Sequence, residues 1–526
     1  MKITSCKFNL IFSLFFFLAY NDIFIRKLYG AVAFSGLFIG VLSVLLLFSF
    51  IGANLLFWKP LTKTTASLLM LINAVCLYFM QTYSVSIDKI MLLNVMQTDS
   101  AEAADLLNLR LFAFVAAGAL LPAAILYKTK IIYAPFGQEI RRRLLLVMVS
   151  LALICAIILP NYKTAAQFLR NNRPLRYDLL PVNYIGAVIS AVKIIKKRNH
   201  PLVSVGTDAV FRQAANGKKN LIIVVVGETA RAQNFSLGGY HRPTNQPLDK
   251  FKQDLYYFTD TSSCGTATAV SLPCMFSPYG RDSFKPGSEA YTENVLDVMQ
   301  RSGYSVLWRE NNSGCKDVCN RIERERFCKD TSCADDILLR NFTSAIETFD
   351  NNTVVVLHQQ GSHGPAYYKR YPKDFEIYKP ACNTGQLDKC SQQEIINAYD
   401  NSITYSSHMI ARAIEKLQKL QNKYNVALLY MSDHGESLGE NGIYLHSAPY
   451  MLAPKTQTQI PFFIWLPPQS AQAYGINPDC LKNKLSQPAS HDNLFHILLG
   501  LGNVQTSVYD KNLDILALCR KNSTAG

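Results

Sequence analysis

The chain has 526 residues, a mass of 59.0 kDa and a mean hydropathy of +0.07, which is high for a soluble protein. Its 53 basic and 38 acidic residues are unevenly spread, because residues 1–160 carry only 13 of the basic and 6 of the acidic ones. This composition excludes a single uniform soluble domain and indicates an apolar, membrane-embedded region (1–160) that precedes a more polar one.

Five apolar segments in the first region are candidates for membrane spans. Residues 30–58 form a stretch of 29 residues without one formal charge, against the roughly 20 that a membrane helix needs. The other four candidates are shorter or interrupted, and they cover residues 8–25, 65–84, 111–127 and 144–159. The sequence therefore predicts five transmembrane helices.

Basic residues between these segments indicate the orientation, since lysine and arginine favour the cytoplasmic side. Alternate loops are basic, from Lys2 and Lys7 to the run 141–143, although Arg26 and Lys27 lie on the opposite side. An odd number of spans beginning inside places the chain after residue 159 outside the membrane. If the first segment is instead a cleaved signal peptide, for which no A-x-A site is visible, the C-terminal region is still exported.

Residues 161–215 are predicted to be a linker rich in asparagine, proline and basic residues. Within it, "IGAVISAVKIIKK" has apolar positions at helical spacing and ends in basic residues. Two interpretations remain open, a helix lying along the membrane surface and an ordinary amphipathic linker helix.

The exported domain, residues 216–526, contains apolar runs that end in polar residues. "NLIIVVVGE", "NTVVVLHQQGSHGP" and "NVALLYMSDHGE" are typical of strands buried on both faces of a parallel sheet, and residues 395–420 have a helical apolar face. Strand, helix and strand predict an α/β sheet with its ligand site at the carboxyl ends of the strands. Glu228, His363, Asp433 and His434 would meet there. Each could alternatively be an ordinary turn residue or helix cap.

A metal and a nucleophile are both suggested by the residue types. Carboxylates and imidazoles in one site suit zinc better than magnesium or calcium. In "SSCGTATAVSLPCMF", Thr266, Thr268 and Ser271 are candidate hydroxyl nucleophiles, and a helix beginning after the glycine would favour a phosphate. Without a metal site, this loop is better explained as a capped helix start held by a disulfide.

Ten cysteines after residue 260 occur as close neighbours, which is typical of disulfides in an exported domain. Proximity, with the last pair left by elimination, predicts Cys264–Cys274, Cys315–Cys319, Cys328–Cys333, Cys382–Cys390 and Cys480–Cys519. The alternative is a zinc-finger-like site built on "CKDVC" and "CKDTSC", whose spacing is irregular.

Longer blocks carry a family resemblance over essentially the whole chain. "VVVGETARAQNFSLGGYHRPTN", "SCGTATAVSLPCMFS", "WRENNSGCKDVC", "GSHGPAYYKRY", "YMSDHGESLGENGIYLHSAPY" and "SHDNLFHILLGL" resemble successive blocks of the lipid A phosphoethanolamine transferases. The resemblance implies a bacterial inner-membrane protein with an α-helical transmembrane domain of about five spans. It also implies a periplasmic α/β domain of the alkaline phosphatase and sulfatase type, with a mixed, mostly parallel sheet.

The resemblance also implies roles for individual residues. Thr268 matches the nucleophile, and one tight zinc site, with a second ion allowed, matches Glu228, Thr268, Asp433 and His434. Catalytic or phosphate-binding positions match Lys316, His363, His446 and Asn312, and positions that hold the ethanolamine end of the donor match Asn94, Thr98 and Glu102. His358, His491 and His496 match family positions to which no catalytic role is assigned.

The implied reaction moves phosphoethanolamine from phosphatidylethanolamine to a lipid A phosphate through Thr268, and confers resistance to cationic peptides such as polymyxin. The expected partners are these two lipids and the surrounding membrane, with no nucleic acid, and the chain is expected to be a monomer. Three alternatives remain: an acceptor on the lipopolysaccharide core sugars or elsewhere in the envelope, a membrane-bound phosphatase or sulfatase, and a non-enzymatic sensor or scaffold.

Overall fold

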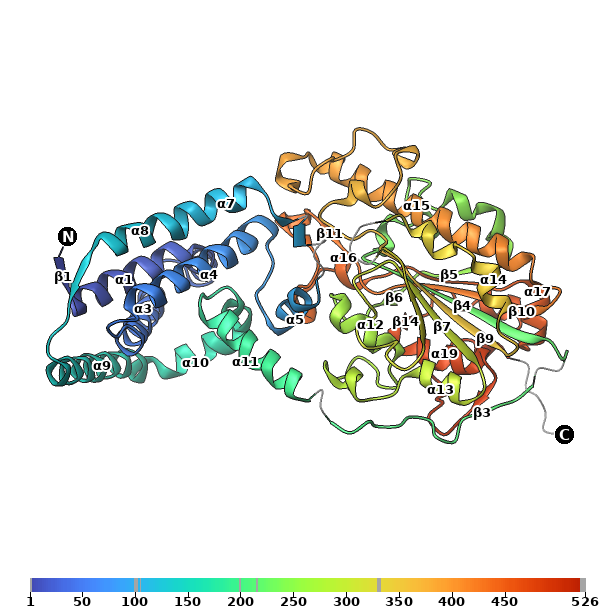
Figure 1. The fold of residues 1–526 in the computed structure, drawn as a ribbon, viewed down its shortest axis with the longest axis horizontal. Coiled ribbons are helices and arrows are strands. Elements are labelled where there is room, and N and C mark those ends of the chain that lie inside the picture. The colour runs from blue at the N-terminus through green and yellow to red at the C-terminus, as the bar shows by residue number, and fades with distance from the viewer. Residues whose placement is uncertain are drawn as a thin grey trace. The chain divides into compact units, whose positions relative to one another are not determined.

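The computed structural model describes residues 2–98, 103–104, 106–197, 200–213, 216–328 and 333–520. Two compact units make up the chain (Figure 1). The first comprises Met1–Lys89 and Leu107–Ile189, and the second comprises Ile90–Leu106 and Ser190–Gly526. A short segment from the apolar N-terminal region therefore belongs to the second unit.

The first unit is almost entirely helical. In chain order its elements are β1 (Lys2–Thr4), α1 (Ser5–Tyr20), α2 (Asp22–Val32), α3 (Gly36–Leu56), α4 (Thr62–Tyr83), α7 (Leu109–Val115), the π-helix η1 (Ala116–Leu120), α8 (Leu121–Lys128), β2 (Lys130–Ile132), α9 (Phe136–Ile158), α10 (Tyr162–Asn171) and the first half of α11 (Val182–Lys197). The two short strands pair in parallel.

Within the described residues, four helices are long and apolar enough to cross a membrane. They are α3, α4, the continuous helix Leu109–Lys128 and the helix Phe136–Asn171. A fifth span is possible if α1 and α2, which meet at an angle of 71°, are taken together. The prediction of about five spans is confirmed to that extent, with the first one bent.

The bend between α1 and α2 and a second helix break each occur at specific residues. Asn21 lies between α1 and α2, and its side-chain oxygen accepts a hydrogen bond from the backbone N–H of Leu180 at 2.8 Å. The uncharged stretch 30–58 is not one helix, because Ala33 has a positive φ of 50° and Ser35 caps the start of α3. Lys27, on the unexpected side of the membrane, forms an ion pair with Asp178 at 2.8 Å.

The second unit is built on a twisted sheet. Among the described residues, seven strands form it in the order β5-β13-β10-β4-β9-β7-β8. Their bounds are β4 (Lys219–Gly227), β5 (Leu255–Phe258), β7 (Ser305–Glu310), β8 (Glu323–Arg326), β9 (Thr353–His358), β10 (Tyr424–Ser432) and β13 (Phe462–Trp465). β13 runs in the direction opposite to the other six strands of this sheet, so the predicted mixed, mostly parallel sheet is confirmed.

Helices cover both faces of this sheet (Figure 1). Ile222, Val224 and Val226 of β4 face a core shared with α12, α13 and α19, while the intervening residues face a core shared with α14 and α15. The apolar run of β4 is fully buried because a strand turns successive side chains to opposite faces. Burial of each such side chain stabilises the fold by about 1.5–3 kcal/mol.

The remaining elements of the second unit are shorter, apart from α15. The helices are α5 (Lys89–Gln97), α12 (Thr268–Phe276), α13 (Val295–Arg301), α14 (Phe342–Glu347), α15 (Gln392–Gln418), α16 (Lys455–Thr458), α17 (Pro468–Ala473), α18 (Pro478–Lys482) and α19 (Leu494–Leu501). Short strands are β3 (Val210–Phe211), β6 (Thr261–Ser262), β11 (Ser437–Leu438), β12 (Tyr444–Leu445), β14 (Ala489–Ser490) and β15 (Val504–Gln505).

Five disulfides join cysteines in the described part of the second unit. They are Cys264–Cys274, Cys315–Cys319, Cys328–Cys333, Cys382–Cys390 and Cys480–Cys519. These are the pairs that proximity along the chain predicted. The cysteines of the proposed zinc-finger alternative are therefore engaged in disulfides.

Candidate active site

The site lies where two neighbouring strands end. β4 and β10 pair in parallel with Gly227 opposite Ser432, so the residues that follow leave the sheet side by side. Glu228 follows β4, and Asp433 and His434 follow β10. All three side chains are at most 1% exposed. The sequence prediction that these three residues meet at the sheet edge agrees with the structure.

Glu228, Asp433 and His434 form a cluster that could hold a metal ion. Each offers one ligand atom, and the three atoms lie within 4.8 Å of one another. His434 Nε2 is 3.5 Å from Glu228 Oε1 and 3.4 Å from Asp433 Oδ2. Two carboxylates and one imidazole are a donor set that suits zinc.

Hydrogen bonds orient these ligand atoms. His434 Nδ1 lies 2.9 Å from the carbonyl oxygen of Gly435, so Nδ1 carries the proton and Nε2 keeps its lone pair. Asp433 Oδ1 accepts from the backbone N–H groups of Thr229 and His434, whereas Asp433 Oδ2 is buried without a hydrogen-bond partner among the described residues. A buried carboxylate oxygen in this state needs a cation or a donor, so the residues fit a metal.

The two carboxyl groups differ in their pKa. Burial raises the pKa of Asp433, and the negative charge of Glu228 raises it further. Burial also acts to raise the pKa of Glu228, but electrostatic interactions with the His434 and His363 rings and the hydrogen bond from Thr229 outweigh burial, and the pKa is lowered. Such a pair of buried carboxyl groups would both be ionised only with a cation between them.

Gly435 is required by a close approach of two backbone segments. A Cβ atom on this residue would lie 2.1 Å from the carbonyl oxygen of Thr456. The Gly435 N–H donates to the carbonyl of Gln457 at 3.0 Å. The Gly435 carbonyl, which orients His434, can therefore keep its position only if residue 435 has no side chain.

Thr268 is the first residue of α12 and faces this cluster. Its hydroxyl Oγ1 lies 3.1 Å from Glu228 Oε1 and 3.2 Å from His434 Nε2. The other two candidate hydroxyls are engaged elsewhere. Thr266 Oγ1 donates to the carbonyl of Ala448 at 2.6 Å, and Ser271 Oγ donates to the carbonyl of Ala267 at 2.9 Å.

Two further histidines lie beside the cluster. The ring centroid of His446 is 4.4 Å from that of His434 and 5.4 Å from that of His363. His446 Nδ1 is 2.8 Å from Glu436 Oε2. Burial acts to lower the pKa of His446, but Glu436 outweighs it and raises the pKa; burial lowers the pKa of His363 to about 3.

Asn312 and Lys316 come from the segment that follows β7. Asn312 Nδ2 donates to Glu228 Oε2 at 2.8 Å and to the carbonyl of Gln359 at 2.7 Å, so Asn312 contacts the cluster directly. Lys316 Nζ donates to Ser313 Oγ at 3.0 Å and to the carbonyl of Gln97 at 3.2 Å.

The predicted donor-binding residues belong to α5 and the segment after it. Asn94 and Thr98 are half-buried and four positions apart, and Thr98 Oγ1 donates to the carbonyl of Asn94 at 2.9 Å. Leu93 packs with Ala269 of α12 and Ala191 of α11. α5 therefore contacts the helix that begins with Thr268. Glu102 lies outside the described residues.

Sequence reasoning missed three contributors to the site, namely Thr229, Glu436 and Tyr367. Thr229, with a φ of 58°, donates its hydroxyl to Glu228 Oε1 at 2.6 Å. Glu436 accepts from His446 on one oxygen and from the Tyr367 hydroxyl, at 2.6 Å, on the other. Thr229 and Glu436 stand in the blocks "GET" and "SDHGE", so their position beside the ligands was a usable signal.

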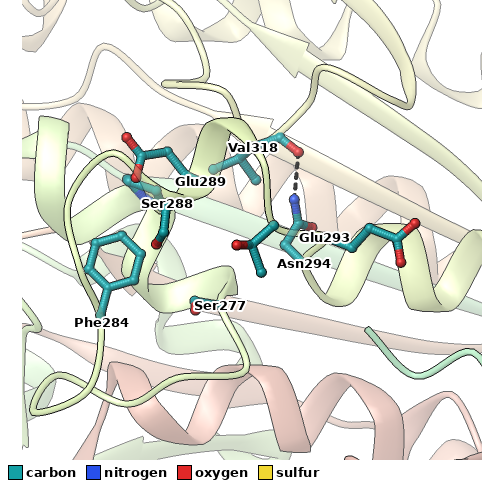
Figure 2. A pocket seen from close by; sticks show the side chains of 9 residues that line it. Ser277, Phe284, Ser288, Glu289, Glu293, Asn294 and Val318 are labelled. Atoms are coloured by element: carbon teal, nitrogen blue, oxygen red, sulfur yellow. Dashed lines mark hydrogen bonds between the residues drawn. The ribbon is translucent and has the colours of Figure 1, made fainter. Parts of the chain in front are cut away.

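A cavity elsewhere in the unit contains none of the predicted site residues. Figure 2 shows it beside the start of α13, where Asn294 Nδ2 donates to the carbonyl of Val318 at 2.8 Å. Its volume of about 10 Å³ holds roughly one water molecule, which is too small for a lipid headgroup.

Known proteins match both parts of the chain. The family model described as Sulfatase matches residues 220–504, and the model described as Phosphoethanolamine transferase EptA/EptB matches residues 43–195. Phosphoethanolamine transferase EptA of Salmonella typhimurium is 40% identical over 495 residues, covering 91% of this chain and 88% of that protein. The chain belongs to the phosphoethanolamine transferase family.

Two more similarities support this family membership. Phosphatidylethanolamine transferase Mcr-1 of Escherichia coli is 37% identical over 484 residues, covering 88% of this chain and 87% of that protein. The integral membrane protein lipooligosaccharide phosphoethanolamine transferase A of Neisseria meningitidis matches with a TM-score of 0.94 and 34% identity, covering 99% of this chain and all of that one. Like the Neisseria protein, the present chain is an integral membrane protein with a soluble periplasmic domain.

Proposed function

We propose that this transferase moves phosphoethanolamine from phosphatidylethanolamine to phosphate groups of lipid A, through a covalent intermediate on Thr268. The proposal rests on the position of the Thr268 hydroxyl, which lies 3.1 Å from Glu228 and 3.2 Å from His434. Both residues belong to the buried cluster that could hold a metal ion. The choice of phosphatidylethanolamine and lipid A follows the resemblance of the sequence blocks. The chain acts as a monomer in this proposal.

Glu228, Asp433, His434 and Thr268 would hold one zinc ion, with a second ion allowed nearby. When bound, zinc would act as a Lewis acid that polarises the phosphate and lowers the pKa of the threonine hydroxyl. The residues themselves fix the geometry. Asn312 and Thr229 each donate to one oxygen of Glu228, and Gly435 fixes the tautomer of His434.

In the first half-reaction, Thr268 gives up its hydroxyl proton to solvent and Oγ1 attacks the phosphorus of phosphatidylethanolamine. A bond from Oγ1 to phosphorus forms, and the bond from phosphorus to the diacylglycerol oxygen breaks. That oxygen leaves as an alcohol after taking a proton, which we assign to His446 because Glu436 stabilises its charged form. The ammonium of Lys316 would stabilise the negative charge on the transferring group, with His363 nearby.

In the second half-reaction, a phosphate oxygen of lipid A attacks the same phosphorus and the bond to Thr268 breaks. Thr268 Oγ1 leaves and takes up a proton, which regenerates its hydroxyl, His446 is reprotonated from solvent, and the acceptor gains phosphoethanolamine. Asn94, Thr98 and Glu102 would hold the ethanolamine end of the donor. The added ammonium lowers the negative charge of the outer surface, from which we expect resistance to polymyxin and other cationic peptides.

Mass spectrometry of lipid A tests this function. Cells that produce the intact protein should add phosphoethanolamine to lipid A, and cells that produce Thr268→Ala at equal abundance should not. Polymyxin susceptibility should follow the same pattern. A gain confined to the core oligosaccharide would contradict the acceptor, and release of free phosphate or sulfate from soluble esters without transfer would contradict the reaction class.

A further inference from the structure

His491 is a buried histidine that the proposed reaction does not use. It begins the short turn η14 (His491–Asn493), and its side chain is 0% exposed. No metal-type ligand set within the described residues includes it. Its contacts nevertheless connect two parts of the active site.

Both ring nitrogens of His491 bond to the backbone of active-site segments. Nδ1 accepts from the N–H of Cys264 at 3.0 Å, and Nε2 lies 2.8 Å from the carbonyl oxygen of Ser432. A backbone N–H can only donate and a carbonyl can only accept, so Nε2 carries the proton and the ring is neutral. Burial lowers the pKa of His491 to about 4, which agrees with a neutral ring.

The two bonded segments carry the nucleophile and the ligands. Cys264 lies four residues before Thr268 and forms half of the disulfide that spans it. Ser432 directly precedes Asp433 and His434. One imidazole ring therefore spans the loop of Thr268 and the strand end that supplies two ligands, although these lie far apart in sequence.

The turn that carries His491 is itself well held. Ala489 and Ser490 (β14) pair in parallel with Thr261 and Ser262 (β6), the strand that leads into Cys264. Asn493 caps the turn by accepting from the Ser490 N–H at 2.7 Å, and α19 follows in one of the two cores of the sheet. A ring on such an anchor can fix the separation of the two segments it contacts.

We propose that His491 is a positioning residue that sets the distance between Thr268 and the ligand pair Asp433 and His434. The proposal rests on the proposed function, in which Thr268 is the nucleophile. Misplacement of a reacting group by about 1 Å can lower a rate about 10²-fold. Among the described residues, the hydrogen bonds of His491 go to Cys264 and Ser432 and not to Asn94 or Thr98, so the expected loss is in kcat rather than in KM.

Substitutions that keep one bond or neither give the test. His491→Asn places an oxygen near the position of Nδ1, His491→Gln places a donor near the position of Nε2, and His491→Leu removes both. His496 supplies the matched control, because it is 3% exposed and its Nδ1 accepts from the backbone N–H of Asp510 at 3.0 Å, away from the site.

The experiment uses full-length protein in nanodiscs containing phosphatidylethanolamine and lipid A. It measures kcat, KM for the donor, zinc per chain by elemental mass spectrometry, and the melting temperature. We expect His491→Asn and His491→Gln to lower kcat about 10-fold to 10²-fold and His491→Leu to lower it further. KM should stay within about threefold, zinc should stay at the wild-type level, and the His496 variants should keep kcat within about threefold.

Three outcomes would overturn the role of His491: a kcat equal to that of the matched His496 variant, a loss confined to KM, or loss of zinc. If the His491 variants do not fold, Ser490→Ala decides, because it removes the hydroxyl that accepts from the Asp492 N–H in the same turn. It should lower kcat severalfold with unchanged KM, and an unchanged kcat would refute the proposal. Wild-type protein that transfers nothing would instead refute the proposed function.

Discussion

The candidate metal cluster and the proposed donor-binding segment of the second unit are built in contrasting ways. Glu228, Asp433 and His434 are buried at the ends of two paired strands, and several hydrogen bonds hold them. Asn94 is half-buried on the nine-residue helix α5, which packs on α12 through Leu93, and Thr98, also half-buried, directly follows that helix. The comparison suggests that the sheet fixes the chemistry, while a separate short helix selects the donor.

The largest effect should come from the ligands themselves. Asp433→Asn replaces the buried oxygen that has no hydrogen-bond partner by an amide, which is a weak metal ligand and loses the charge. We expect transfer to fall at least about 10³-fold and zinc to be lost, as measured by lipid mass spectrometry and elemental analysis. Asp400→Asn makes the same chemical change at a buried residue that pairs with Arg242, and zinc should be retained.

The next largest effect is expected at Thr266, which connects the loop before Thr268 to the segment after His446 by hydrogen bonds. The Thr266 hydroxyl donates to Ala448, and the Thr266 carbonyl accepts from Ser447, so this threonine holds the His446 segment beside α12. Thr266→Val removes only the hydroxyl, and kcat should fall about 10-fold to 10²-fold with unchanged zinc. Thr266→Ser should restore most of the rate. Equal rates for the valine and serine variants would contradict this role.

Comparison of two disulfides can distinguish an effect on the position of Thr268 from an effect on the stability of the fold. By the chain-entropy model, removing Cys264–Cys274 lowers the free energy of unfolding by about 3 kcal/mol and removing Cys480–Cys519 lowers it by about 4 kcal/mol. The order for activity should be reversed. Replacement of the first pair by alanine should lower kcat about 10-fold, whereas replacement of the second should leave kcat within about twofold, in parallel melting and transfer assays. If the two activities track the two stabilities, the first disulfide has no special positioning role.

The smallest effect is expected on α5. Asn94→Ala and Thr98→Ala should raise KM for phosphatidylethanolamine severalfold and change kcat little, because neither side chain belongs to the cluster. Met96→Ala, an exposed residue of the same helix, is the control and should change neither value by more than about twofold. A loss of kcat equal to that of Thr266→Val would remove the distinction between chemistry and donor selection.

The sheet and its ligand positions could be predicted because buried strands leave a strong local pattern. β4, β9 and β10 each contain a continuous apolar run, and the residue after β4 and the two after β10 are polar. The short strands β5, β8 and β13 were not predicted, since each is only four residues long. The bend after α1 was missed because it depends on Asn21 and its long-range contact with Leu180.

Local sequence pattern alone could not identify the nucleophile among the three candidate hydroxyls. Thr266, Thr268 and Ser271 are equivalent in residue type, and only the resemblance distinguished Thr268. In the structure, Thr266 and Ser271 bond to backbone carbonyls while Thr268 faces Glu228 and His434. The role of His491 was hidden for the same reason, because both of its partners are backbone groups of distant segments.

Gly435 offers a way to recognise inactive copies of such an enzyme from sequence. Its φ does not require glycine, but the carbonyl of Thr456 occupies the space that any side chain would need. A substitution would therefore displace the carbonyl that orients His434 while leaving each metal-type ligand in place. We therefore expect a related chain with all metal-ligand residues but a larger residue at this position to be inactive. Inspection of the ligand residues alone would wrongly classify such a chain as an active enzyme.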